Sequence, residues 1–306
     1  MSKDLGYTFC SAADSRAYFV AAVVKELEDR DVSHAVVFEY HDGQWMRWSM
    51  RSRIRSLIAL RELNAVSMMV LTEEGRVRVS RRGEVSDEDV DPGEEGPTRL
   101  RPLSFIRAIG SHVYAVGMQR QVYRRSLHAA GWERIDEAIR VPRSRQDIAG
   151  LRAIDGTPDE KQLIAVGLGG EIWSWRNGQW SPHDSPTNAR LHTVRFVQPN
   201  KVVVAGARGL VLIGDGEDRW RELAHDAGNV TFSCIETAFG RHFLCAEPGD
   251  VYELTDDDRL VTVDVGWIGG GGWLDAGRDI LLAAGNENVT AFDGAAWRDS
   301  TPPDAP

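Results

Sequence analysis

Polar side chains recur at matching positions in short apolar segments along the chain. The second residue of three such segments is cationic or titratable: Arg107, Arg152 and His192. Three places further on, the same series carries Arg61, Asp155, Arg195 and Glu236. If the segments lie side by side, these side chains either bind a ligand or line a water-filled channel in which they are solvated or paired, and we favour the second interpretation. The candidate binding residues are Arg107, Arg152, His192, Arg195 and Glu236.

The other reactive residues form no recognised catalytic pattern. The eight histidines include no pair with the His-x-x-x-His spacing of a zinc site, and none is placed to suggest a His-based triad. The run Gly269-Gly270-Gly271-Gly272 lacks the following helix and the Lys-Ser/Thr of a phosphate loop, which favours close backbone packing instead. The sequence therefore predicts no catalytic residue, no metal site and no cofactor.

Carboxylates concentrate in the segment 83–96, which we interpret as an acidic loop insertion. Its acidic residues are Glu84, Asp87, Glu88, Asp89, Asp91, Glu94 and Glu95. Their order lacks the spacing of an EF-hand loop and its closing Glu. The favoured interpretation is a solvated, mobile loop, and the alternative is an arm that binds a basic protein partner.

The elements that position these residues come from a unit that returns about every forty residues. In the clearest copies, an apolar strand ending in Gly is followed by a hairpin and then by Trp132, Trp180, Trp220 or Trp297. Two weaker copies fill the longer gaps, so that units end near positions 45, 85, 132, 180, 220, 260 and 297. Several short strands per unit at this period predict an all-β, seven-bladed β-propeller with four-stranded blades. The leading segments are then innermost, and the candidate binding residues lie at the mouth of the axial channel.

The N-terminal segment 1–34 departs from the repeat. Asp14 and Ser15 precede a run, Ala17 to Glu28, that has the cap and the apolar spacing of a short helix. The alternative is that Tyr18 to Val24 forms the second strand of the first blade. We slightly favour the helix, with His34 to Tyr40 and Gln44 to Met50 as the outer strands of that blade.

The composition limits the cellular compartments and the classes of partner that are expected for this chain. The formal net charge of −10 argues against general nucleic-acid binding, which needs a basic face. No stretch is apolar enough for a membrane span, and Met1-Ser2-Lys3-Asp4 does not resemble a secretory signal. Three cysteines indicate a reducing compartment, so Cys234 and Cys245 are more simply two buried thiols than a disulfide. We expect a cytoplasmic, monomeric, single-domain protein over residues 1–306.

Two phrases in the middle of the chain carry a family resemblance. Residues 115–125 read Ala-Val-Gly-Met-Gln-Arg-Gln-Val-Tyr-Arg-Arg, and 165–180 contain Ala-Val-Gly-Leu-Gly-Gly-Glu-Ile and then Asn-Gly-Gln-Trp. These phrases resemble the repeats of bacterial propellers of the photosystem II assembly factor type and of tectonin-like lectins. The resemblance implies a largely non-catalytic propeller that binds a ligand or partner, and it transfers no site residues.

Three functions follow in order of preference. The first is a non-enzymatic protein-interaction module, in a more specific form an immunity or antitoxin-like inhibitor that sequesters a cationic effector protein. The second is a lectin-like carbohydrate-binding propeller, which the ten Trp residues favour. The third is a metal-dependent lyase or lactonase at the channel mouth, for which the ligand pattern is missing.

Overall fold

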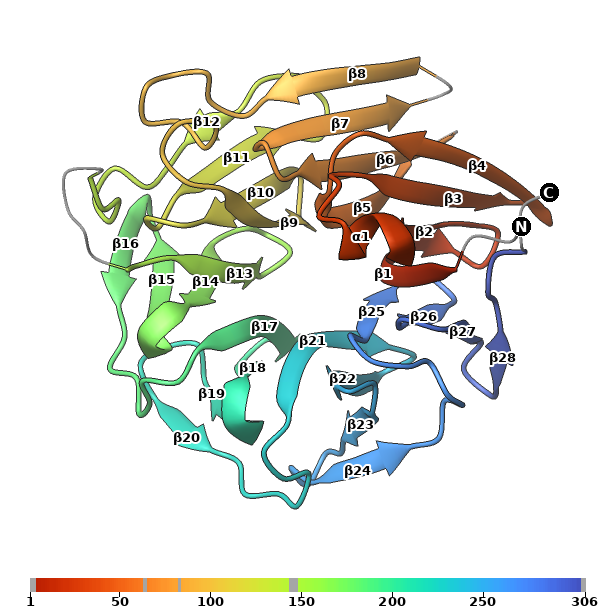
Figure 1. Ribbon diagram of the computed structural model, residues 1–306. Coiled ribbons are helices and arrows are strands. Elements are labelled where there is room, and N and C mark those ends of the chain that lie inside the picture. The colour runs from red at the N-terminus through yellow and green to blue at the C-terminus, as the bar shows by residue number, and fades with distance from the viewer. Residues whose placement is uncertain (1–3, 63–64, 82–83, 143–147, 304–306) are drawn as a thin grey trace. The chain divides into compact units, whose positions relative to one another are not determined.

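The computed structural model describes residues 4–62, 65–81, 84–142 and 148–303. Its strands form seven four-stranded antiparallel sheets, each built from four consecutive strands (Figure 1). The fold is an all-β, seven-bladed propeller, as the repeat predicts. By its internal packing the chain divides into two compact units, Met1–Thr72 with Arg78–Ser86 and Glu236–Pro306, and Glu73–Val77 with Asp87–Ile235.

The first two blades and the last two contain the following elements. Blade 1 comprises β1 (Leu5–Asp14), β2 (Ala17–Val24), β3 (Ala35–His41) and β4 (Gln44–Met50), with α1 (Lys25–Asp29) between β2 and β3. Blade 2 comprises β5 (Ile54–Glu62), β6 (Ala65–Thr72), β7 (Arg76–Arg81) and β8 (Glu84–Asp89). Blade 6 comprises β21 (Thr231–Ala238), β22 (Arg241–Glu247), β23 (Val251–Leu254) and β24 (Leu260–Val263). Blade 7 comprises β25 (Trp273–Ala276), β26 (Leu281–Ala284), β27 (Val289–Phe292) and β28 (Trp297–Asp299).

The three middle blades all lie in the second unit. Blade 3 comprises β9 (Leu103–Ile109), β10 (His112–Gly117), β11 (Val122–Ser126) and β12 (Glu133–Arg134). Blade 4 comprises β13 (Leu151–Gly156), β14 (Gln162–Gly167), η1 (Leu168–Gly170), β15 (Ile172–Arg176) and β16 (Gln179–Pro182). Blade 5 comprises β17 (Leu191–Gln198), β18 (Lys201–Gly206), η2 (Ala207–Gly209), β19 (Val211–Gly214) and β20 (Trp220–Glu222).

The second strand of these blades forms the apolar centre of each sheet. In β10, β14 and β18 every residue after the first is buried, because both faces pack against neighbouring blades. That two-sided burial explains why these strands are continuous apolar runs instead of alternating patterns. The hairpin between β15 and β16 turns at Asn177-Gly178, whose φ values of 50° and 81° suit the left-handed positions of a type I′ turn.

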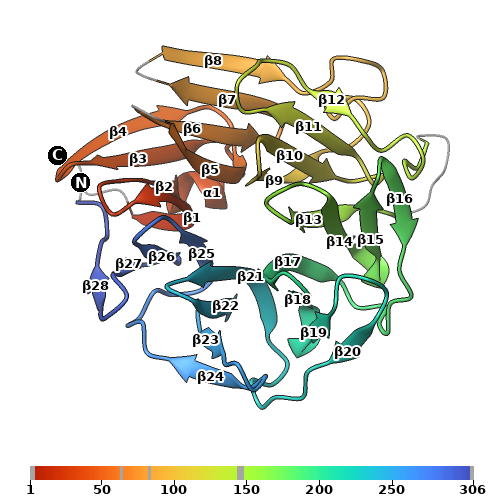
Figure 2. The same ribbon diagram turned by 180° about the vertical axis from the view of Figure 1, so that it is seen from behind.

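The leading strands of adjacent blades lie next to one another within each unit. In the second unit β13 contacts both β9 and β17, and the three strands are side by side in both views (Figures 1 and 2). In the first unit β1 contacts β5 and β25. The segments predicted to be innermost therefore neighbour one another, as the candidate site requires.

The favoured helix at the N-terminus is wrong for most of its length. Residues Ala17–Val24 form strand β2, and only Lys25–Asp29 are helical. Burial explains the difference, because seven of the eight residues of β2 are buried and a helix would expose one side of that run. The segment 5–24 supplies the first two strands of blade 1 and belongs to the repeat.

The interpretation of 83–96 as a loop is also wrong for its first half. Residues Glu84–Asp89 form β8, the fourth strand of blade 2, and the chain leaves the sheet only after Asp89. The strand was concealed by its composition, because an outermost strand with five exposed residues among six has no apolar face for a pattern to reveal.

The first and last blades pack directly against each other and share no strand. Asp275 on β25 accepts hydrogen bonds from the Ser11 hydroxyl, at 2.9 Å, and from the Ala12 amide, at 2.8 Å. Beyond them, Asp279 accepts from the amide and hydroxyl of Ser15. These carboxylate contacts join the two ends of the chain within the first unit. No helix in the described part of the chain is long and apolar enough to cross a bilayer.

Candidate functional site

An aspartate on β13 connects two arginines that lie on the leading strands β9 and β17, one on either side of it. Asp155 Oδ1 lies 3.0 Å from Nε of Arg107 on β9 and 3.5 Å from Nη1 of Arg195 on β17. Its other oxygen accepts the amide of Phe196 at 2.8 Å. The side chains of Arg107, Asp155 and Arg195 are only 14%, 7% and 20% exposed. Three adjacent blades are thus joined by one buried carboxylate, an arrangement that suits a structural role.

The other two candidates from these strands are more exposed than Asp155. Arg152 is exposed and His192 is partly buried. Burial lowers the pKa of His192 to about 4, and the nearby positive charges of Arg152 and Arg190 add to that effect. His192 is therefore neutral at neutral pH, and the charged groups that act on it, Arg152 and Arg190, are both cationic.

The depressed pKa of His192 predicts a contribution to the pH dependence of stability. Between pH 4 and its ordinary value of 6.5 the unfolded chain binds a proton at this position and the folded chain does not. Stability from this residue is complete above pH 6.5 and falls by about 1–3 kcal/mol as the pH drops to 4. Urea unfolding of the protein and of His192→Gln at pH 7 and pH 4.5 measures it. Equal acid sensitivity of the two proteins would contradict the assignment.

Glu236 belongs to a different cluster from the other candidates. It lies on β21, is 4% exposed, and its charge acts on the buried thiol of Cys10. Burial, followed by the charges of Asp275, Cys245 and Glu236, raises the pKa of Cys10 well above its ordinary value, which disfavours the thiolate. All three cysteines are free and buried. The side chain of Arg61 lies outside the described residues.

The acidic stretch is held by arginines of its own sheet and of blade 3. Glu88 makes two hydrogen bonds of 2.7 Å to the Arg125 guanidinium and accepts the Trp132 indole N–H at 3.1 Å. Asp89 lies 2.8 Å from Arg76. Further along, Glu94 pairs with Arg99 and Glu95 lies 3.8 Å from Arg134. Glu84 and Asp87 are exposed on β8. Much of the negative charge of this stretch is therefore matched by cations from the same unit.

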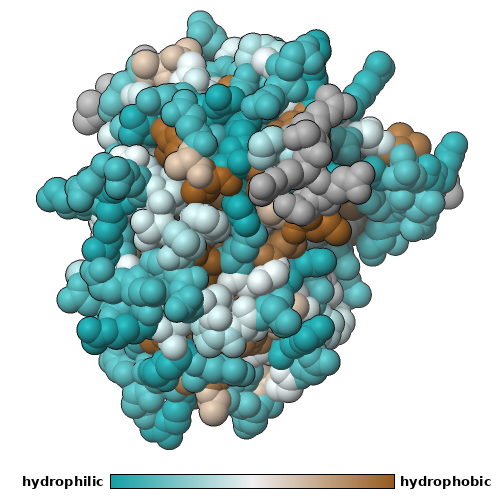
Figure 3. Space-filling view, turned by 90° about the vertical axis from the view of Figure 1, so that its left-hand side faces the viewer, coloured by the Kyte–Doolittle hydropathy of each residue, from teal (hydrophilic) through white to brown (hydrophobic). Residues whose placement is uncertain are grey.

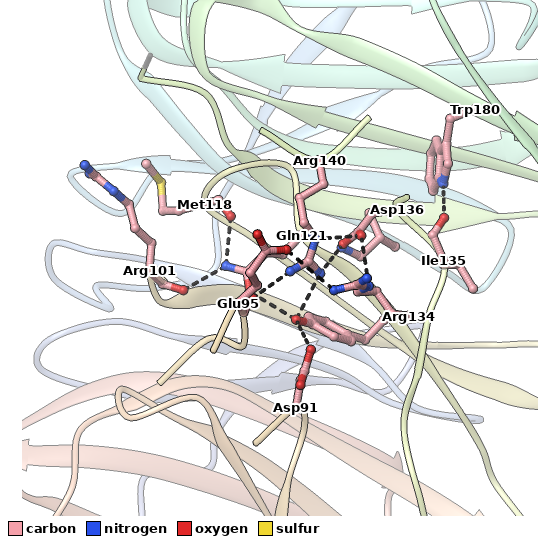
Figure 4. A network of polar contacts seen from close by, with 12 residues as sticks. Asp91, Glu95, Arg101, Met118, Gln121, Arg134, Ile135, Asp136, Arg140 and Trp180 are labelled. Atoms are coloured by element: carbon pink, nitrogen blue, oxygen red, sulfur yellow. Dashed lines mark hydrogen bonds and ion pairs between the residues drawn. The ribbon is translucent and has the colours of Figure 1, made fainter. Parts of the chain in front are cut away.

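A buried ion pair fixes the turn that follows β8 (Figure 4). Asp136 is fully buried and receives two hydrogen bonds of 2.7 Å from Arg140 and one of 2.6 Å from the Val122 amide. Burial raises the pKa of Asp136, and the charge and hydrogen bonds of Arg140 oppose that rise. Arg140 also donates to the Glu95 carbonyl at 2.7 Å and to the Tyr123 hydroxyl at 3.0 Å. Tyr123 in turn donates to Asp91 at 3.2 Å.

The sequence missed this network because its central residues lie in an irregular connection. Asp136 and Arg140 follow β12 in a segment without a counterpart in the repeat. The available signal was their spacing of four residues, which the structure shows as an ion pair. The repeat tryptophans, by contrast, are where their register predicts. Trp180 is 8% exposed and donates to the Ile135 carbonyl at 2.8 Å, and Trp220 donates to His183 at 3.0 Å.

The described surface is rich in hydrophilic side chains (Figure 3). Hydrophilic side chains cover most of the face drawn in Figure 3, and hydrophobic ones show in patches between them. Within residues 4–62, 65–81, 84–142 and 148–303, no group of three or more histidine, cysteine or carboxylate side chains is placed to hold a metal ion. The arrangement of the candidates suits recognition and structural pairing.

Comparison with known structures finds propellers with a similar fold. YCF48 bound to D1 peptide superposes with a TM-score of 0.66 at 17% identity, over 94% of this chain and 93% of that one. YCF48 from Cyanidioschyzon merolae gives 0.66 at 13% identity, with coverage of 94% and 95%. The WD40 propeller domain of Doa1 gives 0.67 at 12% identity, with coverage of 94% and 93%. The resemblance to propellers of the photosystem II assembly factor type is thus confirmed for the fold.

Comparison by sequence gives a relative along nearly the whole chain. No protein-family model matches. Over 290 residues the chain is 29% identical to "Immune protein Tsi7" of Pseudomonas aeruginosa, a match that covers 91% of this chain and 92% of that protein. The similarity spans the full set of blades and is not confined to a few repeats. The chain is thus a seven-bladed β-propeller that is similar, over almost its entire length, to a bacterial immune protein.

Proposed function

We propose that this chain is an immunity protein that binds a toxic effector protein and blocks it by occupying its surface. The observation that carries the proposal is the similarity to Immune protein Tsi7 over 91% of this chain. A match of that extent covers the outer strands and connections as well as the buried strands. Those exposed elements are the ones a propeller uses for recognition.

We also propose that this chain inhibits the effector by binding alone and catalyses no reaction. Three titratable groups on its leading strands are engaged in one structural cluster, in which Asp155 joins Arg107 and Arg195. The buried thiol of Cys10 has a raised pKa, which disfavours the reactive thiolate. A rigid scaffold with broad polar surfaces fits stoichiometric binding better than turnover.

The effector is proposed to be basic, and the inhibitor to act as a cytoplasmic monomer. The formal net charge of −10 favours encounter with a cationic partner. Such steering raises the association rate more than it raises the final affinity. We therefore expect the association rate to fall on the order of tenfold between low and high salt.

Co-expression tests this function directly. Candidate effectors are the products of genes adjacent to the one for this chain, each expressed at a toxic level in a laboratory bacterium. We expect this chain to restore growth against one of them and to form a stoichiometric complex with it. Calorimetry of that complex should give the same affinity with and without a chelator and a weaker one at high salt.

Two outcomes would count against the proposal. Rescue at far below one inhibitor per effector would indicate turnover, and the chain would then be an enzyme. A glycan as the sole recovered ligand, with no effector neutralised, would instead favour the carbohydrate-binding alternative. A tenfold excess of inactive effector, which should titrate a binding inhibitor and abolish rescue, provides the control.

A further inference from the structure

An open cleft of about 650 Å³ lies in the first unit, between the segment that follows β24 and the outer strands of blade 7. Its walls include Asp264, Trp267, Thr290 and Asp299. None of these residues belongs to the axial series or to the acidic stretch. The cleft combines an aromatic surface, carboxylates and a hydroxyl, and one kind of ligand can interact with all three groups.

The aromatic wall is an exposed tryptophan held in a fixed orientation. Trp267 is 66% exposed, although its neighbours Val265 and Ile268 are 4% and 1% exposed and anchor the segment in the core. Its indole N–H donates to Glu287 at 2.6 Å, and its carbonyl accepts from the Asn288 side chain at 2.7 Å. The ring therefore faces solvent without the freedom of a loose side chain. Fixed, exposed Trp is a residue type that dominates binding energy at protein interfaces.

The charge of the cleft is negative. Asp264 and Asp299 each accept one backbone amide through Oδ1, from Gly266 and Thr301, both at 3.0 Å. Neither carboxylate makes an ion pair with any described residue. The cationic residue of the lining is Arg298, and it lies 2.9 Å from Asp293. A cation entering the cleft thus meets two carboxylates whose charge is not already matched.

A buried hydroxyl in the wall lacks a partner. Thr290 is 8% exposed, and its Oγ1 forms no hydrogen bond with the described residues. Buried hydroxyls without a partner are uncommon, because desolvation of the group goes uncompensated. A ligand with several N–H donors would satisfy this oxygen as it enters the cleft.

We propose that this cleft is a guanidinium-binding site that receives an arginine side chain of the partner protein. A guanidinium stacks on the Trp267 ring, donates to Asp264 and Asp299, and offers a further N–H to Thr290. An ammonium makes the ion pairs but has no plane to stack. The inference rests on the proposed function for its partner, and the guanidinium chemistry of the site can be tested alone.

The first test uses N-acetyl-arginine amide as the probe and N-acetyl-citrulline amide as its uncharged, nearly isosteric control. Both are titrated into protein labelled with ¹⁵N at the tryptophans, and the Trp267 indole resonance is assigned from the spectrum of Trp267→Phe. The arginine probe should shift that resonance at a concentration about fivefold or more below any effect of the citrulline probe. Equal responses to the two probes would overturn the site.

Matched variants test whether the arginine probe binds at the residues of the cleft. Thr290→Val keeps the shape of the side chain and removes the acceptor, and Asp264→Asn with Asp299→Asn removes charge alone. Each change should weaken the arginine probe about threefold or more. Val261→Ala, at a 51% exposed position on the neighbouring strand β24, should leave it unchanged. Loss of probe binding in Val261→Ala, or none in the other variants, would contradict the geometry.

The second test uses the effector that the chain neutralises. Trp267→Ala should raise the Kd of that complex about tenfold or more, while Val261→Ala leaves it within twofold of the parent. Neutralisation with unchanged affinity in Trp267→Ala would overturn the docking site and leave the proposed function standing. Arginine-selective probe binding without any neutralised effector would do the reverse, supporting the site and removing the proposed function.

Discussion

Replacing Arg140 by Met is expected to lower the free energy of unfolding by about 3–5 kcal/mol. Asp136 is fully buried, and Arg140 pairs with it at 2.7 Å, whereas Arg134 lies 4.0 Å from it. Without Arg140 the buried carboxylate keeps only the Val122 amide and the more distant guanidinium of Arg134, 4.0 Å away, as compensation among the described residues. Chemical denaturation of the two proteins at pH 7 measures the difference.

The variant should also change its dependence on pH. Without Arg140 the pKa of Asp136 in the folded chain rises further above that in the unfolded chain, because the charge and hydrogen bonds that chiefly oppose the effect of burial are lost. Stability from such a group is greatest at low pH and is lost as the pH rises through the folded value. The deficit of Arg140→Met should therefore shrink between pH 7 and about pH 5.

The double variant Asp136→Leu with Arg140→Met provides the control. Replacing both partners leaves neither a buried charge nor an unmet guanidinium, so much of the lost stability should return. A loss below about 1 kcal/mol in the single variant, or equal losses in the single and double variants, would show that the pair is not the support of this connection.

Replacing Arg140 should also affect the acidic stretch, because Arg140 contacts it. Arg140 holds the Glu95 carbonyl at 2.7 Å and shares Tyr123 with Asp91. The stretch that the sequence suggested as a mobile loop is thus a strand followed by a turn fastened to blade 3. That this stretch contacts a basic partner stays a prediction, and Glu84 and Asp87 are exposed members of it on β8.

The blades could be predicted because their information is local and repeated. A buried second strand such as β14 must be a continuous apolar run, and a turn such as Asn177-Gly178 needs residues that tolerate positive φ. The same local reasoning failed for Ala17–Val24, since a fully buried strand and a buried helix share an apolar composition. Only the neighbouring strands β1 and β3 decide between them.

The candidate site was predictable in position but not in pairing. The series placed Arg107, Asp155 and Arg195 on leading strands, and the structure brings them together. Glu236 followed the same register, yet it lies with Cys10 in the first unit, whereas Arg107, Asp155 and Arg195 lie in the second. Register fixes where a residue lies in its blade, whereas its partners depend on which side chains the adjacent blades present.

The cleft could not be predicted from the sequence, for a different reason. Trp267 follows a weak repeat and carries no sign that its ring is exposed, since most tryptophans of this chain occupy repeat positions. Thr290 is one residue of an ordinary outer strand. Their common wall forms only when the segment after β24 meets blade 7.

Replacing Trp180 by Ala is expected to cost about 3–5 kcal/mol of unfolding free energy. Its ring is 8% exposed and packs in the cluster that contains Ile139, Ile154 and Leu163. The indole N–H also supports the Ile135 carbonyl at 2.8 Å, just before Asp136. Truncation therefore opens a cavity beside the connection that Arg140 secures.

Trp267→Ala is the matched comparison, because it makes the same chemical change at a position that is 66% exposed. That variant should lose less than about 1 kcal/mol, since little buried area disappears. Thermal unfolding of both variants separates a tryptophan that holds the blades together from one that faces a partner. If Trp180→Ala melts like the parent, or Trp267→Ala melts as low as Trp180→Ala, then burial does not divide the two roles and the assignment of Trp267 to recognition loses its main support.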